Sequence, residues 1–179
     1  MASIYDAINT WSAASYLKND IVSTANDEGE VYYWYAVDDF SSSVSPTVAS
    51  NDWIGRGLLN TAGVSSNLPE FNWKPSYNAS TNIEPRVLNV RFGDGYEQRM
   101  ADGINNKLLV LNLTFDKRNE KETLAINHFL NIRGGAEAFI FTPPSPFSAR
   151  KKFICKKFST NYVFYDNYSI SATFEETPN

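Results

Sequence analysis

The strongest alternation of hydrophobic and polar positions lies at residues 107–115, KLLVLNLTF. The side chains of a strand point alternately to its two faces. One face of this segment would therefore carry Leu109, Leu111, Leu113 and Phe115. Leu108 and Val110 add apolar side chains to the opposite face at the start of the segment. A strand that is apolar on both faces is typical of a sheet interior, so the pattern predicts a central strand.

Shorter alternating segments predict further strands. Leu88, Val90 and Phe92 alternate toward a Gly-Asp-Gly sequence, and Tyr96, Gln98 and Met100 alternate beyond it. Residues 168–174 alternate between large or apolar side chains and serine or threonine, which indicates a strand with one solvent-facing side. Nearer the N-terminus, residues 19–22 and 31–37 are two short strand candidates, separated by a polar, turn-rich segment.

Residues 119–135 instead show a helical period. Asn119 is a candidate N-cap, and Glu122 stands at the spacing of a capping box. Gly134 and Gly135 are a suitable C-terminal stop. The apolar stripe between them comprises Ala125, Ile126, Phe129, Leu130 and Ile132. The pattern predicts one amphipathic helix in a chain that otherwise consists of strands.

Composition and charge divide the chain into two parts. Of the 179 residues, 42% are hydrophobic and 15% aromatic, which is typical of a folded, β-rich protein. Residues 1–68 hold two basic and eight acidic residues, whereas residues 69–179 hold 14 basic and 12 acidic ones. We therefore expect a mainly β protein with a small β module at 1–54, a glycine-containing linker at 55–69, and an antiparallel β domain with one helix at 70–179.

Residues that usually carry chemistry are sparse. His128, the single histidine, falls within the predicted helix, and Cys155, the single cysteine, falls among lysines in a predicted strand. We interpret both as packed side chains, although the sequence alone leaves a Cys–His nucleophile pair open. A metal site needs clustered histidine, cysteine or carboxylate ligands. The sequence thus predicts no catalytic residues, no metal and no cofactor.

Several classes of partner are disfavoured. No apolar run reaches the roughly 18 residues of a membrane span, so we expect no membrane partner. The N-terminus lacks a basic segment followed by an apolar core, so no secretory signal is predicted. The acidic first part has the wrong sign for attraction to phosphates, and we expect no sequence-specific nucleic-acid binding.

The segment RFGDGYEQR (91–99) concentrates charged residues around two glycines. It lacks the third glycine and the following helix of a dinucleotide-binding loop. Asp-Gly between alternating apolar residues instead predicts a tight turn, because glycine adopts positive φ without a steric cost. The charged and aromatic residues of this turn are either solvent-exposed neighbours or an assembly interface, and its candidates are Arg91, Asp94, Tyr96 and Arg99.

Two further segments of the second part have unusual composition. Residues 150–157, RKKFICKK, hold five basic residues, which suits either a solvated edge strand or docking against an acidic partner. Residues 139–147, FIFTPPSPF, should begin as a short strand and then become a stiff extended loop, because proline cannot donate a backbone hydrogen bond. Pro143 and Pro144 in this loop are additional candidates for an assembly interface.

Taken in order, the motifs of residues 71–179 resemble the minor tail protein M family of lambda-like, long-tailed bacteriophages. They are FNW (71–73), VLNVRFGDGYEQRMADGIN (87–105), FLNIRGG (129–135), AFIFTPP (138–144), KKFICKKFS (151–159) and YSISATFEE (168–176). The resemblance implies a β-sandwich or barrel of the tail-tube type with a flanking helix.

The same resemblance implies a structural component of the virion. It would be made in the host cytoplasm and would close as a ring, expected to be a hexamer, at the distal end of the tail. Its partners would be the tail tube protein and the hub proteins that carry the receptor-binding apparatus. No enzymatic activity is expected.

The first part contains, in order, Trp11, YLKNDIV (16–22), YYWYA (32–36), Pro46 and Trp53. This order resembles that of a small carbohydrate-binding module of secreted glycosidases, with Asn19 where glycine is common. It implies that a sugar, such as a host surface glycan, stacks on Trp11, Trp34, Tyr35 and Trp53. Two alternatives stay open: these rings form the core of a small module, or the module only docks on protein. Gripping host polysaccharide is therefore the alternative to the tail-ring function.

Overall fold

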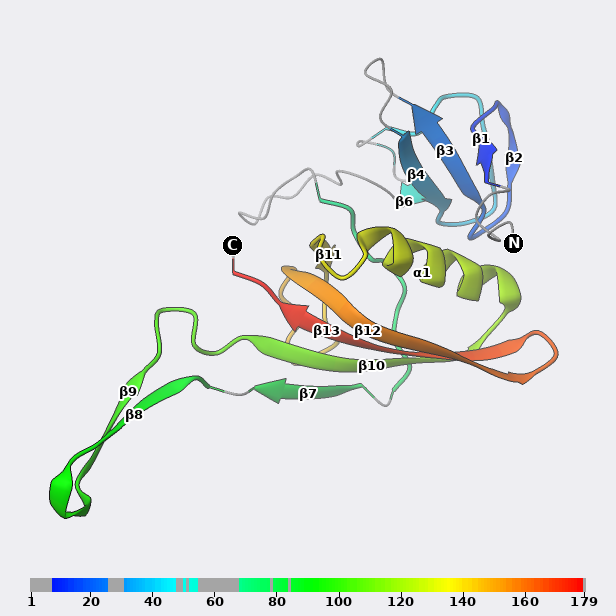
Figure 1. The fold of residues 1–179 in the computed structure, drawn as a ribbon. Coiled ribbons are helices and arrows are strands. Elements are labelled where there is room, and N and C mark those ends of the chain that lie inside the picture. The colour runs from blue at the N-terminus through cyan, green and yellow to red at the C-terminus, as the bar shows by residue number, and fades with distance from the viewer. Residues whose placement is uncertain are drawn as a thin grey trace.

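The structure is a computed structural model, and it describes residues 8–25, 31–47, 50, 52–54, 68–77, 79–83 and 85–178. The mainly β class with one flanking helix is confirmed. Figure 1 shows the single helix of the described residues lying between a small N-terminal sheet and a longer sheet, with a separate hairpin projecting from one end.

The longer sheet is antiparallel throughout, in the order β11-β12-β13-β10-β7. Its strands are β7 (Ser80–Ile83), β10 (Leu109–Arg118), β11 (Phe139–Phe141), β12 (Lys151–Phe164) and β13 (Asn167–Glu176). As predicted, β10 lies inside the sheet, and its buried positions are Leu109, Leu111, Leu113 and Phe115. The one-sided pattern of β13 is also confirmed, because Ile170, Ala172 and Phe174 are buried.

Helix α1 (Glu120–Arg133) covers the apolar face of this sheet (Figure 1). The Asn119 side chain accepts a hydrogen bond of 2.8 Å from the backbone N–H of Glu122, which confirms the predicted N-cap. The capping box is only half formed, because the Glu122 carboxylate binds Arg118 at 2.7 Å. The helix ends where Gly134 turns into the left-handed conformation at φ 53°.

The N-terminal part forms two small sheets. The first has the order β1-β3-β4-β6, from β1 (Asn9–Thr10), β3 (Ile21–Ala25), β4 (Val31–Ala36) and β6 (Trp53–Ile54). The second pairs β2 (Ala14–Tyr16) with β5 (Phe40–Ser42). The first predicted strand begins two residues later than expected, at Ile21, because Asn19 adopts φ 66° and cannot continue an extended strand.

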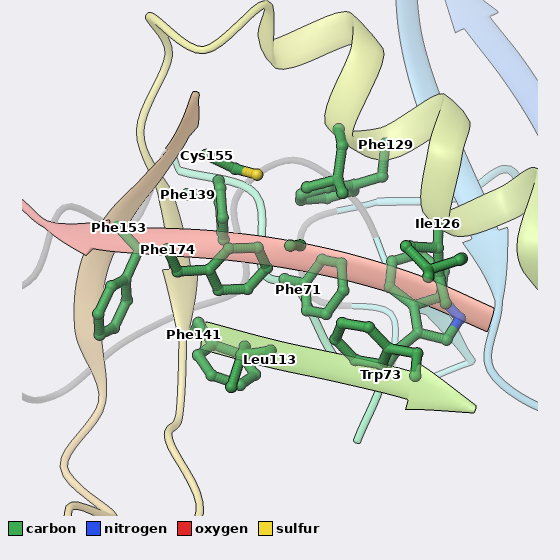
Figure 2. Close-up of a cluster of buried hydrophobic side chains, with 14 of the residues drawn as sticks. Phe71, Trp73, Leu113, Ile126, Phe129, Phe139, Phe141, Phe153, Cys155 and Phe174 are labelled. Carbon is green, nitrogen blue, oxygen red and sulfur yellow. The ribbon is translucent and has the colours of Figure 1, made fainter. Parts of the chain in front are cut away.

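The two parts share a hydrophobic core. Tyr35 of β4 and Ile54 of β6 are buried together with side chains of α1 and of the longer sheet. The segment before β7 connects them, because Trp73 contacts the Tyr35 ring at 5.3 Å and the Phe71 ring at 5.0 Å. Figure 2 shows Phe71 and Trp73 filling the space between Phe129 of the helix and the sheet. Of the predicted linker, residues 55–67 lie outside the described residues.

The basic segment 150–157 is only partly an edge strand. Lys151, Lys152 and Phe153 pair with β11, so the prediction of a solvated edge is wrong for the start of β12. The expected loop after β11 is confirmed. Several of the basic side chains bind carboxylates of the same chain: Arg150 binds Glu70 at 2.7 Å, Lys151 binds Glu176 at 2.8 Å and Lys156 binds Glu175 at 2.5 Å.

Candidate functional site

The segment around RFGDGYEQR forms a separate two-stranded hairpin, which we call the arm (Val87–Ala101). It comprises β8 (Val87–Arg91), a short 3₁₀ turn η2 (Gly93–Gly95) and β9 (Glu97–Ala101). Figure 1 shows the arm extending away from the longer sheet. Every residue of β8 is exposed, and β9 is exposed except for the half-buried Glu97. Neither face of the hairpin therefore packs on the described body of the protein.

The predicted tight turn is confirmed. Asp94 at φ 69° and Gly95 at φ 80° supply the two left-handed residues that reverse the chain. The backbone N–H of Phe92 donates to the carbonyl of Tyr96 at 2.8 Å and closes the turn. The rings of Phe92 and Tyr96 lie 5.9 Å apart, so an aromatic pair stands at the end of the arm.

The arm is amphipathic. Facing pairs in the register are Leu88 with Met100 and Val90 with Gln98, so these side chains share one face. Asn89 with Arg99 and Arg91 with Glu97 form the opposite face, which is polar and charged except for the Val87–Ala101 pair. A strand pair with one apolar face usually buries that face against another element. Here it is exposed, with accessibilities of 50% for Leu88, 42% for Val90 and 48% for Met100.

The structure places the six predicted interface residues on two separate surfaces. The arm carries Arg91, Asp94, Tyr96 and Arg99. All four are exposed, and the Arg99 guanidinium lies 3.5 Å from the Glu97 carboxylate. Pro143 and Pro144 instead line a groove of about 740 Å³ together with Trp73 and Tyr77, and none of the arm candidates lines it.

Sequence reasoning missed a second exposed apolar surface, which we call the aromatic tip (162–165). It comprises the last three residues of β12 and the first residue of the turn into β13, and Tyr162, Val163, Phe164 and Tyr165 are all exposed by more than half. The Tyr162 ring also contacts Tyr168 at 5.5 Å. The signal in the sequence was the run YVFY directly before Asp166-Asn167, which is four large apolar or aromatic residues at a turn.

Three of the four candidate sugar-binding rings are buried. Trp34 and Trp53 belong to the small N-terminal core with Tyr16, whereas Tyr35 faces helix α1. Their exposed fractions are 4% or less, so they present no open ring face for stacking. Trp11 is half-buried against the same small core. This placement corrects the expectation of an exposed platform and fits the alternative in which the rings form the module core.

His128 lies at the contact between the two parts rather than near a reactive group. Its Nδ1 is hydrogen-bonded to the Tyr35 hydroxyl at 2.8 Å, and its ring meets Tyr33 edge-on at 4.8 Å. Burial, together with the nearby positive charge of Arg133, lowers the pKa of His128 from 6.5 to about 4. The imidazole is thus neutral at pH 7 and is fixed by its packing.

Cys155 is also a packed residue. It is 2% exposed, and its Sγ donates a weak hydrogen bond of 3.4 Å to the Lys157 carbonyl. Burial raises the pKa of the thiol from 9.0 to about 11, despite the lysines on either side. The reactive thiolate is therefore disfavoured at neutral pH.

The described residues offer neither a metal site nor a membrane-spanning helix. Within these residues, no group of three or more His, Cys, Asp or Glu side chains could hold a metal ion. None of the helices in the same residues is both long and apolar enough to cross a membrane. What the described surface does offer is apolar side chains on the arm and the aromatic tip, which suit contacts with protein.

Comparison with known proteins identifies the second part of the chain. The family model described as "Phage minor tail protein" matches residues 69–177. Tail tip protein M of Escherichia phage lambda is 35% identical over 109 residues, which cover 61% of this chain and 97% of that protein. The N-terminal sheets lie before the matched residues. The chain therefore belongs to the phage minor tail protein family, and its β-rich second part is that of a virion structural protein.

Proposed function

We propose that this protein is a subunit of a ring at the distal tip of the tail of a long-tailed bacteriophage, where the ring joins the tail tube to the hub. The relative that covers the second part is named as a tail tip protein, which supports this location. The observation that carries the assembly role is the arm, whose apolar face lies uncovered in the single subunit.

An uncovered arm implies a partner. An isolated two-stranded hairpin is marginally stable in water, and a hydrophobic face gains stability when another surface covers it. The apolar face carries Leu88, Val90 and Met100, and the aromatic pair Phe92 and Tyr96 extends it to the turn. Assembly would bury this surface, so we infer that the arm becomes ordered and stable in the particle.

A ring also requires two different contact surfaces on each subunit. Head-to-tail contacts close into a ring when the rotation between neighbours divides a full turn. The remaining surfaces of the subunit are then available to the tube on one side and the hub on the other. Six copies are expected from the resemblance to the lambda-like family.

The protein's role is structural, without a reaction of its own. The two residues that sequence reasoning considered for nucleophilic chemistry are both engaged in packing: His128 with Tyr35 and Cys155 within the sheet. Synthesis in the host cytoplasm followed by incorporation into the tail tip is consistent with this role. We expect no direct reading of nucleic-acid sequence.

For the N-terminal part, we propose a protein-docking role in place of glycan binding. Trp34, Tyr35 and Trp53 are buried, which argues against stacking of a sugar on them. Three side chains of the second part hold the N-terminal part in place. Their contacts are the bond from Trp73 Nε1 to Asn19 Oδ1 at 3.0 Å, the Tyr35–His128 bond, and the ion pair of Lys121 with Asp20 at 2.5 Å.

Native mass spectrometry of the purified protein over a range of concentrations, with cryo-electron microscopy of intact tail ends, tests the proposal. We expect a closed oligomer in solution or in the particle, and density for the protein between tube and hub. Tails that contain no copy of the protein, or tip density accounted for by other proteins, would contradict it. A glycan array with the intact protein tests the alternative, and specific binding that Trp11→Ala abolishes would support a sugar-binding role.

A further inference from the structure

We propose that the ring contact is head-to-tail, with the apolar face of the arm of one copy covering the aromatic tip of the next copy. This inference rests on the proposed ring function and specifies its interface. Its starting observation is that the described residues carry two uncovered apolar surfaces on hairpins, the arm at 87–101 and the tip at 162–165.

The two surfaces stand at opposite ends of the same strand. The arm precedes β10, whose first residue, Leu109, pairs with Ile83 of β7. At the other end of β10, Arg118 pairs with Tyr168, directly beside the tip. A strand of ten residues spans about 30 Å, so the sheet holds the two surfaces well apart. Figure 1 shows the arm and the β12–β13 connection projecting in opposite directions.

This arrangement excludes covering of the tip by the arm of the same copy and suits a repeating contact. Two different surfaces at opposite ends generate a heterologous interface, in which each copy contributes its arm on one side and its tip on the other. A two-fold dimer could also place each arm on the tip of the other copy, but it would stop at two copies, whereas the proposed ring repeats the contact around a closed circle. In the ring, one type of contact covers both apolar surfaces of every copy.

The side chains of the two surfaces are chemically matched. The arm presents aliphatic residues with an aromatic pair at its end, and the tip presents three aromatic rings and a valine. Aromatic residues often dominate the binding energy of an interface and tend to pair with one another across it. Such surfaces bury much area at a low cost in side-chain entropy.

Charges beside these surfaces are complementary. The exposed guanidinium groups of Arg91 and Arg99 lie on the face of the arm opposite its apolar face, and that of Arg99 also lies 3.5 Å from the Glu97 carboxylate. The tip is flanked by the exposed carboxylates of Asp116, Glu120 and Asp166. A hollow of about 350 Å³ lies at the start of α1 beside the tip and is lined by Glu120, Lys121 and Asp166 among others. Arginine side chains are long enough to reach past the apolar contact to such carboxylates.

Cysteine cross-linking in the assembled protein tests the direction of the contact. Leu88→Cys places a thiol on the apolar face of the arm, and Tyr165→Cys places one on the tip. The two variants should form a disulfide when they are mixed and assembled, while neither variant alone should cross-link. A variant with both cysteines should produce a ladder that ends at the ring size. The wild-type protein controls for the buried Cys155.

Matched substitutions test which faces of the arm and the tip form the contact. Val87 and Leu88 are neighbours with accessibilities of 49% and 50%, but they lie on opposite faces of β8. Leu88→Lys should raise the concentration needed for half-assembly by about tenfold or more, as for a central interface residue, and Val87→Lys should change it little. At the tip, Tyr165→Ser should weaken assembly while Ile104→Ser, at an apolar residue that is 99% exposed outside the arm and the tip, should not. Circular dichroism of the monomers checks that all four fold.

The possible outcomes distinguish failure of the proposed arm-to-tip contact from failure of the proposed ring function. Cross-links within a single variant, or a cross-link from Leu88→Cys to a tube or hub protein, would overturn the head-to-tail contact while the ring function stands. Assembled rings without any arm-to-tip cross-link would also overturn it. If the protein is absent from tail tips and stays monomeric, both the contact and the proposed function fail.

Discussion

The Tyr35 hydroxyl lies 2.8 Å from Nδ1 of His128, and both residues are buried between β4 and helix α1. This hydrogen bond joins the N-terminal part, which lies outside the family match, to the helix of the matched domain. It is one of the contacts that make the two parts a single packed unit. Since its partners lie 93 residues apart in the chain, it reports directly on the tertiary structure.

Replacing Tyr35 by phenylalanine should destabilise the protein. The substitution leaves a buried imidazole nitrogen without this hydroxyl partner, which costs about 1–3 kcal/mol of unfolding free energy. Urea denaturation followed by tryptophan fluorescence measures the change. Tyr96→Phe is the matched control, because its ring is 67% exposed at the end of the arm. Equal midpoints for Tyr35→Phe and the wild type would show that the bond contributes nothing to stability.

The protein should lose stability between pH 6.5 and pH 4 because of His128. Its pKa is lowered to about 4 in the folded state by burial first and by Arg133 second. The unfolded chain therefore binds a proton in this range that the folded protein does not, and stability falls as the pH falls. The full effect is about 3 kcal/mol at roughly 1.4 kcal/mol per pKa unit.

Other groups titrate in the same pH range, so the contribution of His128 must be measured as a difference between two proteins. The pH dependence of the unfolding free energy of the wild type is compared with that of His128→Gln, which cannot take up the proton. The wild type should show the steeper fall from pH 6.5 to pH 4. Parallel curves for the two proteins would mean that His128 does not titrate with a lowered pKa.

Asn19 should tolerate glycine better than alanine. Its φ of 66° lies in the left-handed region, which glycine adopts freely and which costs alanine about 1 kcal/mol or more. Its Oδ1 also accepts a hydrogen bond from the Trp73 indole, which both substitutions remove at a cost of about 1 kcal/mol. The expected order of stability by thermal denaturation is wild type, then Asn19→Gly, then Asn19→Ala. An alanine variant at least as stable as the glycine variant would contradict this account of the backbone.

Cys155 should react slowly with thiol reagents in the folded protein. Raising the pKa from 9.0 to about 11 lowers the thiolate fraction at pH 8 by about a hundredfold, and burial blocks access further. The rate of reaction with a chromogenic disulfide reagent should rise to that of a free cysteine when urea is added. Rapid stoichiometric labelling in buffer alone would show that the thiol is accessible and activated.

Local patterns were sufficient for most elements of the second part, although they did not predict β7. The alternation in β10 and β13, the cap at Asn119 and the turn at Asp94-Gly95 all depend on interactions within a few residues. Short-range geometry of this kind is written in the sequence, because the side-chain period and the backbone conformation are properties of neighbouring residues.

Burial of neighbouring aromatic residues was decided by the tertiary structure. Trp34 and Tyr35 are neighbours in β4 and point to its opposite faces. Both are buried, because Trp34 faces the small N-terminal core while helix α1 and Trp73 cover Tyr35 from the other side. The expectation of exposed sugar-binding rings was therefore wrong, because the sequence does not show which elements pack on the second face of β4.

In the arm, by contrast, the alternation of apolar residues does not coincide with burial. Its apolar positions alternate as those of β10 do, although Gln98 interrupts them, yet Leu88 and Val90 are exposed whereas Leu111 and Leu113 are buried. By itself the sequence determined the longer strands, the helix, the turn at 93–95 and the family resemblance of residues 71–179. Only the tertiary structure decided which apolar faces are covered, because covering depends on elements that lie far away in the chain and meet through packing.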